Sequence, residues 1–259
     1  MTSKEAIKMT VVAGTASAAA AQVDTAAVDA AFETLKTYDW GADRGLLNPI
    51  DQAIIATHGD AAARKALEKR LVDALAGGIS RSAQDYVCRK LRVIGTSQSV
   101  EALAALLPAE QTSHIARYAL ERLPDEKAVD AMRDALPKVR GKLKSGLIGS
   151  LGVRRDAKSV TAIAGFLGDS DIEAARAAAQ SLGLIGTPAA AGELSKFAGK
   201  ASADMKMPVA DARLVCAERL LADGNQSEAV ALYKALQGDD QPGRVRAAAL
   251  KGMLAATKK

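Results

Sequence analysis

The feature that most constrains this 259-residue chain is an internal repeat. An apolar residue at position i is followed by a small residue at i+2, an apolar residue at i+3 and a Leu at i+7. Copies of this pattern start at Val100, Val129 and Val160. A weaker copy starts at Ala191 and a fuller one at Ala229. Apolar residues at i, i+3 and i+7 share one face of an α-helix, so each copy predicts an amphipathic helix.

A second helical pattern follows each copy of the first, with apolar or small residues four positions apart. Its members are Ala83-Val87-Leu91, Ile115-Ala119-Leu123, Leu143-Leu147-Leu151, Ala174-Ala178-Leu182, Ala212-Cys216-Leu220 and Val245-Ala249-Met253. Residues that end or cap helices fall between the patterns, for example Pro124-Asp125 and Gly186-Thr187. Two helices therefore alternate with a step of about 30 residues. The step from Ala191 to Ala229 is longer, and its extra residues predict an extended loop over 199–204.

The composition fits helices that pack closely on one another. Hydrophobic residues make up 49% of the chain but aromatic residues only 3%, so the core must consist of Ala, Leu, Ile and Val. We predict an all-α fold, a right-handed α-solenoid of about seven antiparallel helix pairs that forms one domain over residues 23–259. Residues 23–60 hold three of the eight aromatic side chains, Phe32, Tyr38 and Trp40, and are predicted to form an atypical capping pair.

The repeat resembles a known family. The segment from Ser181 to Pro188, with Ala174-Ala175-Arg176 before it and Ala191-Gly192-Glu193-Leu194 after it, is similar to the HEAT-like repeat first described in phycobilin lyases. The resemblance extends over residues 60–256, and the whole chain is similar to HEAT-repeat proteins of the Planctomycetes and Verrucomicrobia type. It implies a non-catalytic scaffold whose second helices line a concave surface that binds a protein partner.

In this family the position after the first apolar anchor of the second helix tends to face the concavity and often holds Arg. The resemblance thus implies a partner-binding set for an acidic protein surface, made of Gln84, Arg117, Lys144, Arg176, Arg213 and Arg246. The alternative is that each cation pairs with an acidic neighbour in the adjacent repeat.

A basic run offers a second hypothesis, that of a nucleic-acid-binding solenoid. Its members are Lys138, Arg140, Lys142, Lys144, Arg154 and Arg155, with no acid between Asp134 and Asp156. No aromatic side chain interrupts the run, so the stacking that single-stranded nucleic acid requires is missing. The chain as a whole is only weakly basic, with 35 basic against 30 acidic residues. A solvated basic face is the alternative interpretation.

The sequence indicates no catalytic, metal or cofactor site. Cys88 and Cys216 lie far apart without a CxxC motif, and we expect Cys216 in the core and Cys88 half-buried. His58 and His114 have no Ser or Cys nucleophile at an interpretable spacing. Some HEAT-like proteins are DNA glycosylases, which need aromatic side chains around an extruded base. This chain has only one Trp, Trp40. A third hypothesis, that the chain is a lyase-type maturation chaperone, rests on fold analogy alone.

The N-terminal segment, residues 1–22, allows two interpretations. Lys4 and Lys8 precede an apolar run, and Ala19-Ala20-Ala21 could serve as a cleavage site, as in a secretory leader. The run has no Leu, Ile or Phe, so the segment is equally a flexible or helical tail. The protein would be exported if residues 1–21 are a cleaved leader and cytoplasmic otherwise. No run of 18 apolar residues follows, so we expect a soluble protein without a membrane span.

Overall fold

A computed structural model describes residues 24–257, and the segment 1–22 discussed above lies outside this range. The described residues form α-helices and short 3₁₀ helices and contain no β-strand, which confirms the all-α prediction. None of the helices in this range has the length and hydrophobicity needed to cross a bilayer.

The described part of the chain forms fourteen α-helices. They are α1 (Thr25–Thr37), α2 (Asn48–Ala56), α3 (Ala61–Ala76), α4 (Arg81–Ile94), α5 (Val100–Ala104), α6 (Ser113–Leu120), α7 (Glu126–Ala135), α8 (Gly141–Val153), α9 (Val160–Ala164), α10 (Ile172–Ile185), α11 (Pro188–Ala198), α12 (Ala203–Ala222), α13 (Gln226–Ala235) and α14 (Gly243–Thr257). The 3₁₀ helices are η1 (Arg44–Leu47), η2 (Ser97–Ser99), η3 (Leu136–Lys138) and η4 (Ala157–Ser159).

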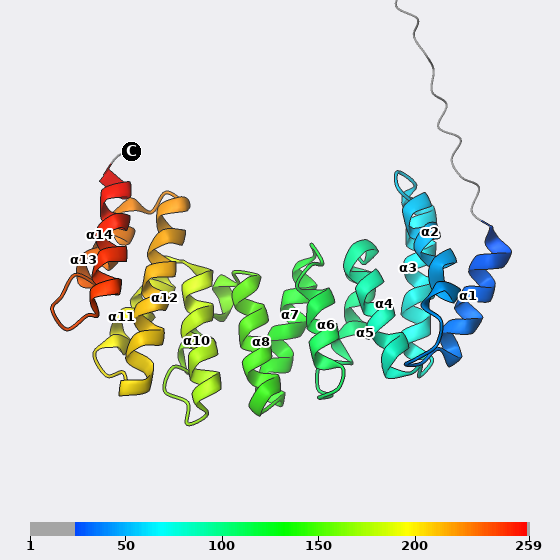
Figure 1. Ribbon diagram of the computed structural model, residues 1–259, viewed down its shortest axis with the longest axis horizontal. Helices are drawn as coiled ribbons and strands as arrows, with labels where there is room; N and C mark the ends of the chain where they lie inside the picture. The colour runs from blue at the N-terminus through cyan, green and yellow to red at the C-terminus, as the bar shows by residue number, and fades with distance from the viewer. Residues whose placement is uncertain (1–23, 258–259) are drawn as a thin grey trace, which may run out of the picture.

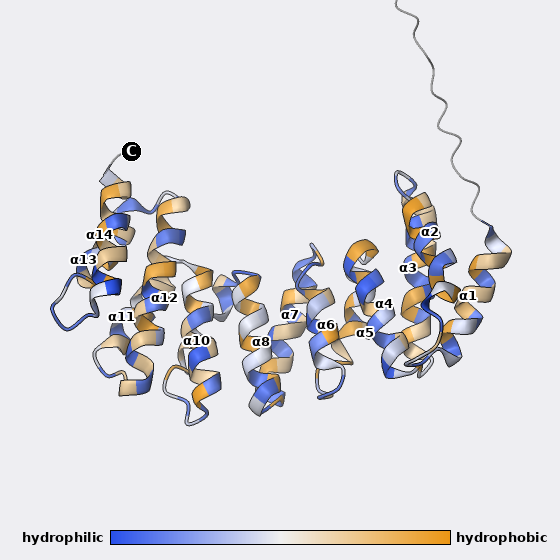
Figure 2. Ribbon diagram, in the orientation of Figure 1, coloured by the Kyte–Doolittle hydropathy of each residue, from blue (hydrophilic) through white to orange (hydrophobic). Residues whose placement is uncertain are grey.

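The helices stand side by side in one row from α1 to α14 (Figure 1). The even-numbered helices from α4 to α14, called the second helices below, contact one another in order, and α9, α11 and α13 also contact one another in order. The row bends into a shallow arc, and α8, α10 and α12 end on its hollow side, at the top of Figure 1. Hydrophobic and hydrophilic residues alternate along these helices (Figure 2). One continuous hydrophobic core runs from Val28 to Ala249.

Side-chain caps begin many of the helices at the positions where the sequence predicts breaks. Asp125 and Thr187 accept hydrogen bonds from backbone N–H groups in the first turns of α7 and α11. These bonds satisfy amides that have no partner inside the helix. Gly186 ends α10 in the left-handed conformation, with φ of +65°. The predicted alternation of helices and breaks is therefore confirmed at these positions.

Two copies of the first pattern form shorter helices than their spacing suggests. α5 and α9 have five residues each, and the chain continues through i→i+3 hydrogen bonds such as Leu107 N–H to Ala104 O. The tighter turns still direct Leu107 and Leu167 into the core, where both are buried.

The extended loop predicted over residues 199–204 is confirmed for residues 199–202, which link α11 to α12. Ala203 and Asp204 already belong to α12, and the other additional residues make this helix twenty residues long. Pro208 lies inside α12 rather than before it. It removes one backbone hydrogen-bond donor in the second turn, and the helix continues past it.

Backbone contact between neighbouring second helices is closest in the middle of the row. A Cβ atom added to Gly183 of α10 would lie 2.7 Å from the carbonyl oxygen of Ala212 in α12. One added to Gly152 of α8 would lie 2.7 Å from Cα of Ser181 in α10. Real Cβ contacts are not this short, so glycine at both positions allows α8, α10 and α12 to pack backbone against backbone.

We predict that Gly183→Ala lowers the free energy of unfolding by about 2 kcal/mol, because the added methyl group forces α10 and α12 apart. Gly149→Ala is the matched control, since nothing lies within 4 Å of a Cβ at that position in α8. The control should raise stability by about 0.5–1 kcal/mol through helix propensity. Urea denaturation of both variants measures the two effects, and stabilisation by both would show that α10 and α12 are not in close contact.

Candidate interaction surface

The six predicted partner-binding residues all lie on second helices. Gln84, Lys144, Arg213 and Arg246 occupy one register on α4, α8, α12 and α14, where α6 and α10 have Ala116 and Ala175. The two alanines are 0% and 1% exposed, and Arg213 is 7% exposed. The expectation that this register faces an open concavity is therefore wrong for the middle of the row, because there it points into the interface with neighbouring elements.

Three of the predicted cations form ion pairs. Lys144 Nζ lies 3.1 Å from Asp169 Oδ2, next to the start of α10, and 5.1 Å from the centre of the Phe166 ring. The Asp171 backbone N–H and the Lys144 ammonium together lower the pKa of Asp169. Two further pairs are Arg176 with Glu173 at 3.1 Å and Arg246 with Asp239 at 3.0 Å. For Lys144 the alternative interpretation, pairing with an acid from the next repeat, describes the geometry.

Arg117 joins α6 to α8. Its Nη1 donates to the carbonyl oxygen of Gly146 and to Oγ of Ser150, both at 3.0 Å. The Ser150 hydroxyl in turn donates to Glu121 Oε1 at 2.6 Å. Burial lowers the pKa of Arg117, and the charge of Glu121 opposes that shift. This guanidinium is thus part of the contact between two helices rather than of an open surface.

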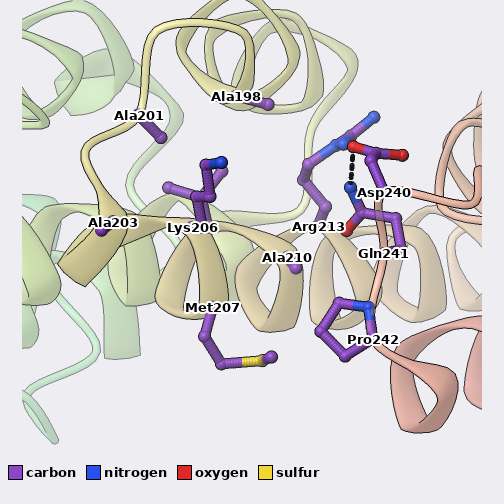
Figure 3. A pocket seen from close by; sticks show the side chains of 11 residues that line it. Ala198, Ala201, Ala203, Lys206, Met207, Ala210, Arg213, Asp240, Gln241 and Pro242 are labelled. Carbon is purple, nitrogen blue, oxygen red and sulfur yellow. Dashed lines mark hydrogen bonds between the residues drawn. The ribbon is translucent and has the colours of Figure 1, made fainter.

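Arg213 differs from the other five because it is buried without a partner. Its Nε–H has no hydrogen-bond acceptor, as in Arg117, but unlike Arg117 it also forms no other hydrogen bond and no ion pair within the described residues. Burial lowers the pKa of Arg213, and the negative charge of Asp240 opposes the shift. The side chain points into a cavity at one edge of α12 (Figure 3). A buried donor without an acceptor costs stability, so this arrangement needs an explanation.

The basic run is divided between the two ends of α8. Lys138, Arg140 and Lys142 are exposed near its start, whereas Arg154 and Arg155 follow its last residue. A helix of thirteen residues is about 20 Å long, so these two groups do not form one patch. The structure therefore does not bring the six predicted residues together.

Arg154 and Arg155 bind the ends of other helices. Arg154 donates to the carbonyl oxygens of Leu120 and Leu123 at the end of α6. Arg155 donates to the carbonyl of Ile185 at the end of α10 and forms an ion pair with Asp223. The last carbonyls of a helix lack partners and carry partial negative charge, which attracts cations. These two charges therefore contribute to helix contacts.

The structure contains an apolar groove between α10 and α12 that the sequence did not predict. It has a volume of about 380 Å³. It is lined by Arg176, Gln180, Leu184, Pro208, Asp211, Ala212 and Val215. Arg176, Gln180 and Leu184 are four residues apart and form an outward stripe, which was the available sequence signal. Of the predicted set, only Arg176 borders this groove.

A basic groove near the N-terminal end was also missed. It has a volume of about 510 Å³, and its lining includes Arg64, Lys65, Arg92 and Arg122. Its acidic member, Glu68, accepts hydrogen bonds from Thr96 and Ser99 and is 1% exposed. Arg92 also lies over the Tyr118 ring at 4.3 Å, but Tyr118 itself is not part of the lining. The residues come from three helices and their links, which is why no run in the sequence indicates them.

The two cysteines are buried thiols. Cys88 and Cys216 are both 0% exposed, so the expected burial of Cys216 is confirmed and the half-buried position expected for Cys88 is wrong. Burial raises the pKa of each to about 12, and the charge of Asp85 adds to the shift at Cys88. Within residues 24–257, no three His, Cys, Asp or Glu side chains gather in an arrangement that could hold a metal ion.

Comparison with known proteins assigns no relative. No protein-family model matches the sequence, and a search of curated proteins finds no significant match. The resemblance to HEAT-like repeats therefore rests on the repeat pattern of the chain alone, and no comparison tests it.

We predict that neither cysteine reacts readily with a thiol reagent in the folded protein. At pH 8 a pKa of about 12 lowers the thiolate fraction by about 10³ relative to an unfolded chain, and burial also blocks access. Both thiols should react fully once denaturant unfolds the protein. Reaction of either cysteine at the unfolded rate under native conditions, followed spectroscopically, would contradict its placement in the core.

We predict that Arg213→Met raises the free energy of unfolding by about 1–2 kcal/mol in buffer without added ligand. Met retains much of the apolar contact and removes a buried charge that lacks a partner. The exposed residue Arg176 provides the control, since Arg176→Met should change stability by less than about 0.5 kcal/mol. Chemical denaturation of both variants decides the matter, and a large loss of stability in Arg213→Met alone would mean that the protein itself satisfies this guanidinium.

Proposed function

We propose that the chain is a right-handed α-solenoid of seven antiparallel HEAT-like helix pairs, and that it serves as a non-catalytic protein-interaction scaffold. Three features support the solenoid: the repeat of about 30 residues, the single row of helices and the continuous core. On this proposal residues 23–259 form one domain, and its first pair, residues 23–60, is the N-terminal cap.

The observation that carries the scaffold role is the groove between α10 and α12. Leu184, Pro208 and Val215 give it an apolar surface between two second helices. Stable protein contacts centre on apolar patches with a polar rim. The groove therefore suits a short apolar segment of a partner.

Arg176 gives this groove a preference for an acidic partner. It pairs with Glu173 of the same helix, and both side chains are largely exposed. An exposed pair of this kind contributes less than about 1 kcal/mol, so Arg176 can exchange Glu173 for an acid of the partner at little cost. We infer a partner segment that carries an acidic residue beside its apolar ones.

The basic groove between α3, α4 and the end of α6 favours nucleic acid as a second candidate ligand. Its four cations meet the need for positive charge against phosphates, whereas the ring of Tyr118 lies under Arg92 and does not line the groove. This assignment moves the nucleic-acid hypothesis away from residues 138–155. If all four cations contact phosphates, affinity for single strands should fall about 50-fold between about 50 and 200 mM salt.

The scaffold role predicts that variants of the groove lose a protein partner. Immobilised wild type, Arg176→Glu, Val215→Asp and the control Lys196→Glu would be incubated with nuclease-treated lysate of the source organism. Lys196 pairs with Glu193 on α11 just as Arg176 does with Glu173 on α10, so its reversal controls for charge. We expect a captured protein whose recovery falls at least about tenfold for both groove variants and not for the control.

Two results would contradict the scaffold role. In the first, the groove variants and the control capture the same proteins in equal amounts. In the second, recovery is confined to nucleic acid before nuclease treatment and is lost as salt rises, which would assign the function to the basic groove instead.

A further inference from the structure

We propose that the cavity around Arg213 is a binding site for a carboxylate carried on a short apolar chain. The cavity lies between α12, the 199–202 link before it and the segment between α13 and α14, and has a volume of about 280 Å³ (Figure 3). A volume of this size suits a small acid or one side chain rather than a large cofactor.

Arg213 is the anchor of this site. It is 7% exposed, and its Nε–H is buried without an acceptor. Asp240 is the acid beside it, but its carboxylate accepts from Gln241 Nε2 at 2.7 Å and forms no ion pair with Arg213. A carboxylate fits the planar guanidinium with two parallel hydrogen bonds, which would satisfy the unpaired donor.

The charges in the lining favour a monoanion. Lys206 and Arg213 are seven residues apart, so both point to the same side of α12, as Figure 3 shows. With Asp240 they leave one net positive charge in the lining. That balance matches a carboxylate better than a doubly charged phosphate. The apolar remainder of the lining comes from Ala198, Ala201, Ala203, Met207, Val209, Ala210 and Pro242.

This site is independent of the proposed scaffold groove. With a rotation of about 100° per residue, Lys206, Ala210 and Arg213 lie on the side of α12 opposite to Asp211 and Val215, which line the groove. Loss of partner capture by groove variants would therefore leave this site intact. Conversely, if no carboxylate binds in the Arg213 cavity, the proposal that the groove binds a protein partner is unaffected.

The carboxylate could come from a free acid or from another protein, and both share the same chemistry. The test follows the Arg213 Nε–H signal in ¹H–¹⁵N spectra of the full chain during titration. The probes are hexanoate and a tripeptide that ends in Leu with a free carboxylate. The comparison probes are the same tripeptide with a C-terminal amide, acetate and inorganic phosphate. Arg213→Met and Arg213→Gln are the site variants, and Lys196→Met is the control, because Lys196 is exposed and lines neither the cavity nor the groove.

We expect a saturable shift of the Arg213 signal below about 10 mM ligand. Saturation by hexanoate identifies a free acid as the source, whereas saturation by the peptide acid but not by its amide or hexanoate identifies a chain terminus. In the spectra of folded Arg213→Met or Arg213→Gln, the shifts of neighbouring signals should be at least tenfold weaker, and in Lys196→Met they should be unchanged. The wild-type signal reports binding even if a variant does not fold.

Three outcomes overturn the proposal. One is that no probe shifts the Arg213 signal. Another is that acetate or phosphate binds as tightly as the longer acids, because the apolar lining would then contribute nothing. The third is that the site variants bind as the wild type does.

Discussion

The close contact between successive second helices is the constraint on which the rest of this structure depends. Gly152 and Gly183 let α8, α10 and α12 approach until backbone meets backbone. Because the helices are this close, the side chains between them must be small or must lie along the interface. Ala116 and Ala175 meet the first requirement, and Arg117 meets the second by binding Gly146 and Ser150.

The same packing explains the positions of three arginines. α8, α10 and α12 end on one side of the row, so their last carbonyls collect there (Figure 1). Arg64, Arg154 and Arg155 each donate to such carbonyls, at the ends of α4, α6 and α10. These three positive charges therefore balance helix ends. Arg213, by contrast, is buried, and no helix end or acid of the described residues accepts a hydrogen bond from it.

The repeat predicted the helices well because core residues four apart have a strong period in the sequence. Its limits lie in the details that depend on the distance between helices. The residue after the anchor is rotated about 100° from it, and only the closeness of the next helix decides whether it meets solvent or protein. The alanines at 116 and 175 were the available sign of burial. The grooves combine residues from separate helices, so no spacing along the chain indicates them.

Native-state hydrogen exchange of α8, α10 and α12 tests the central claim of close, mutually dependent packing most directly. If these helices pack backbone to backbone, their buried amides should share one opening free energy and one denaturant dependence, above those of α1 and α14 at the ends of the row. The claim would be contradicted if the amides of α10 opened at lower free energy and with little denaturant dependence while α8 and α12 remained protected.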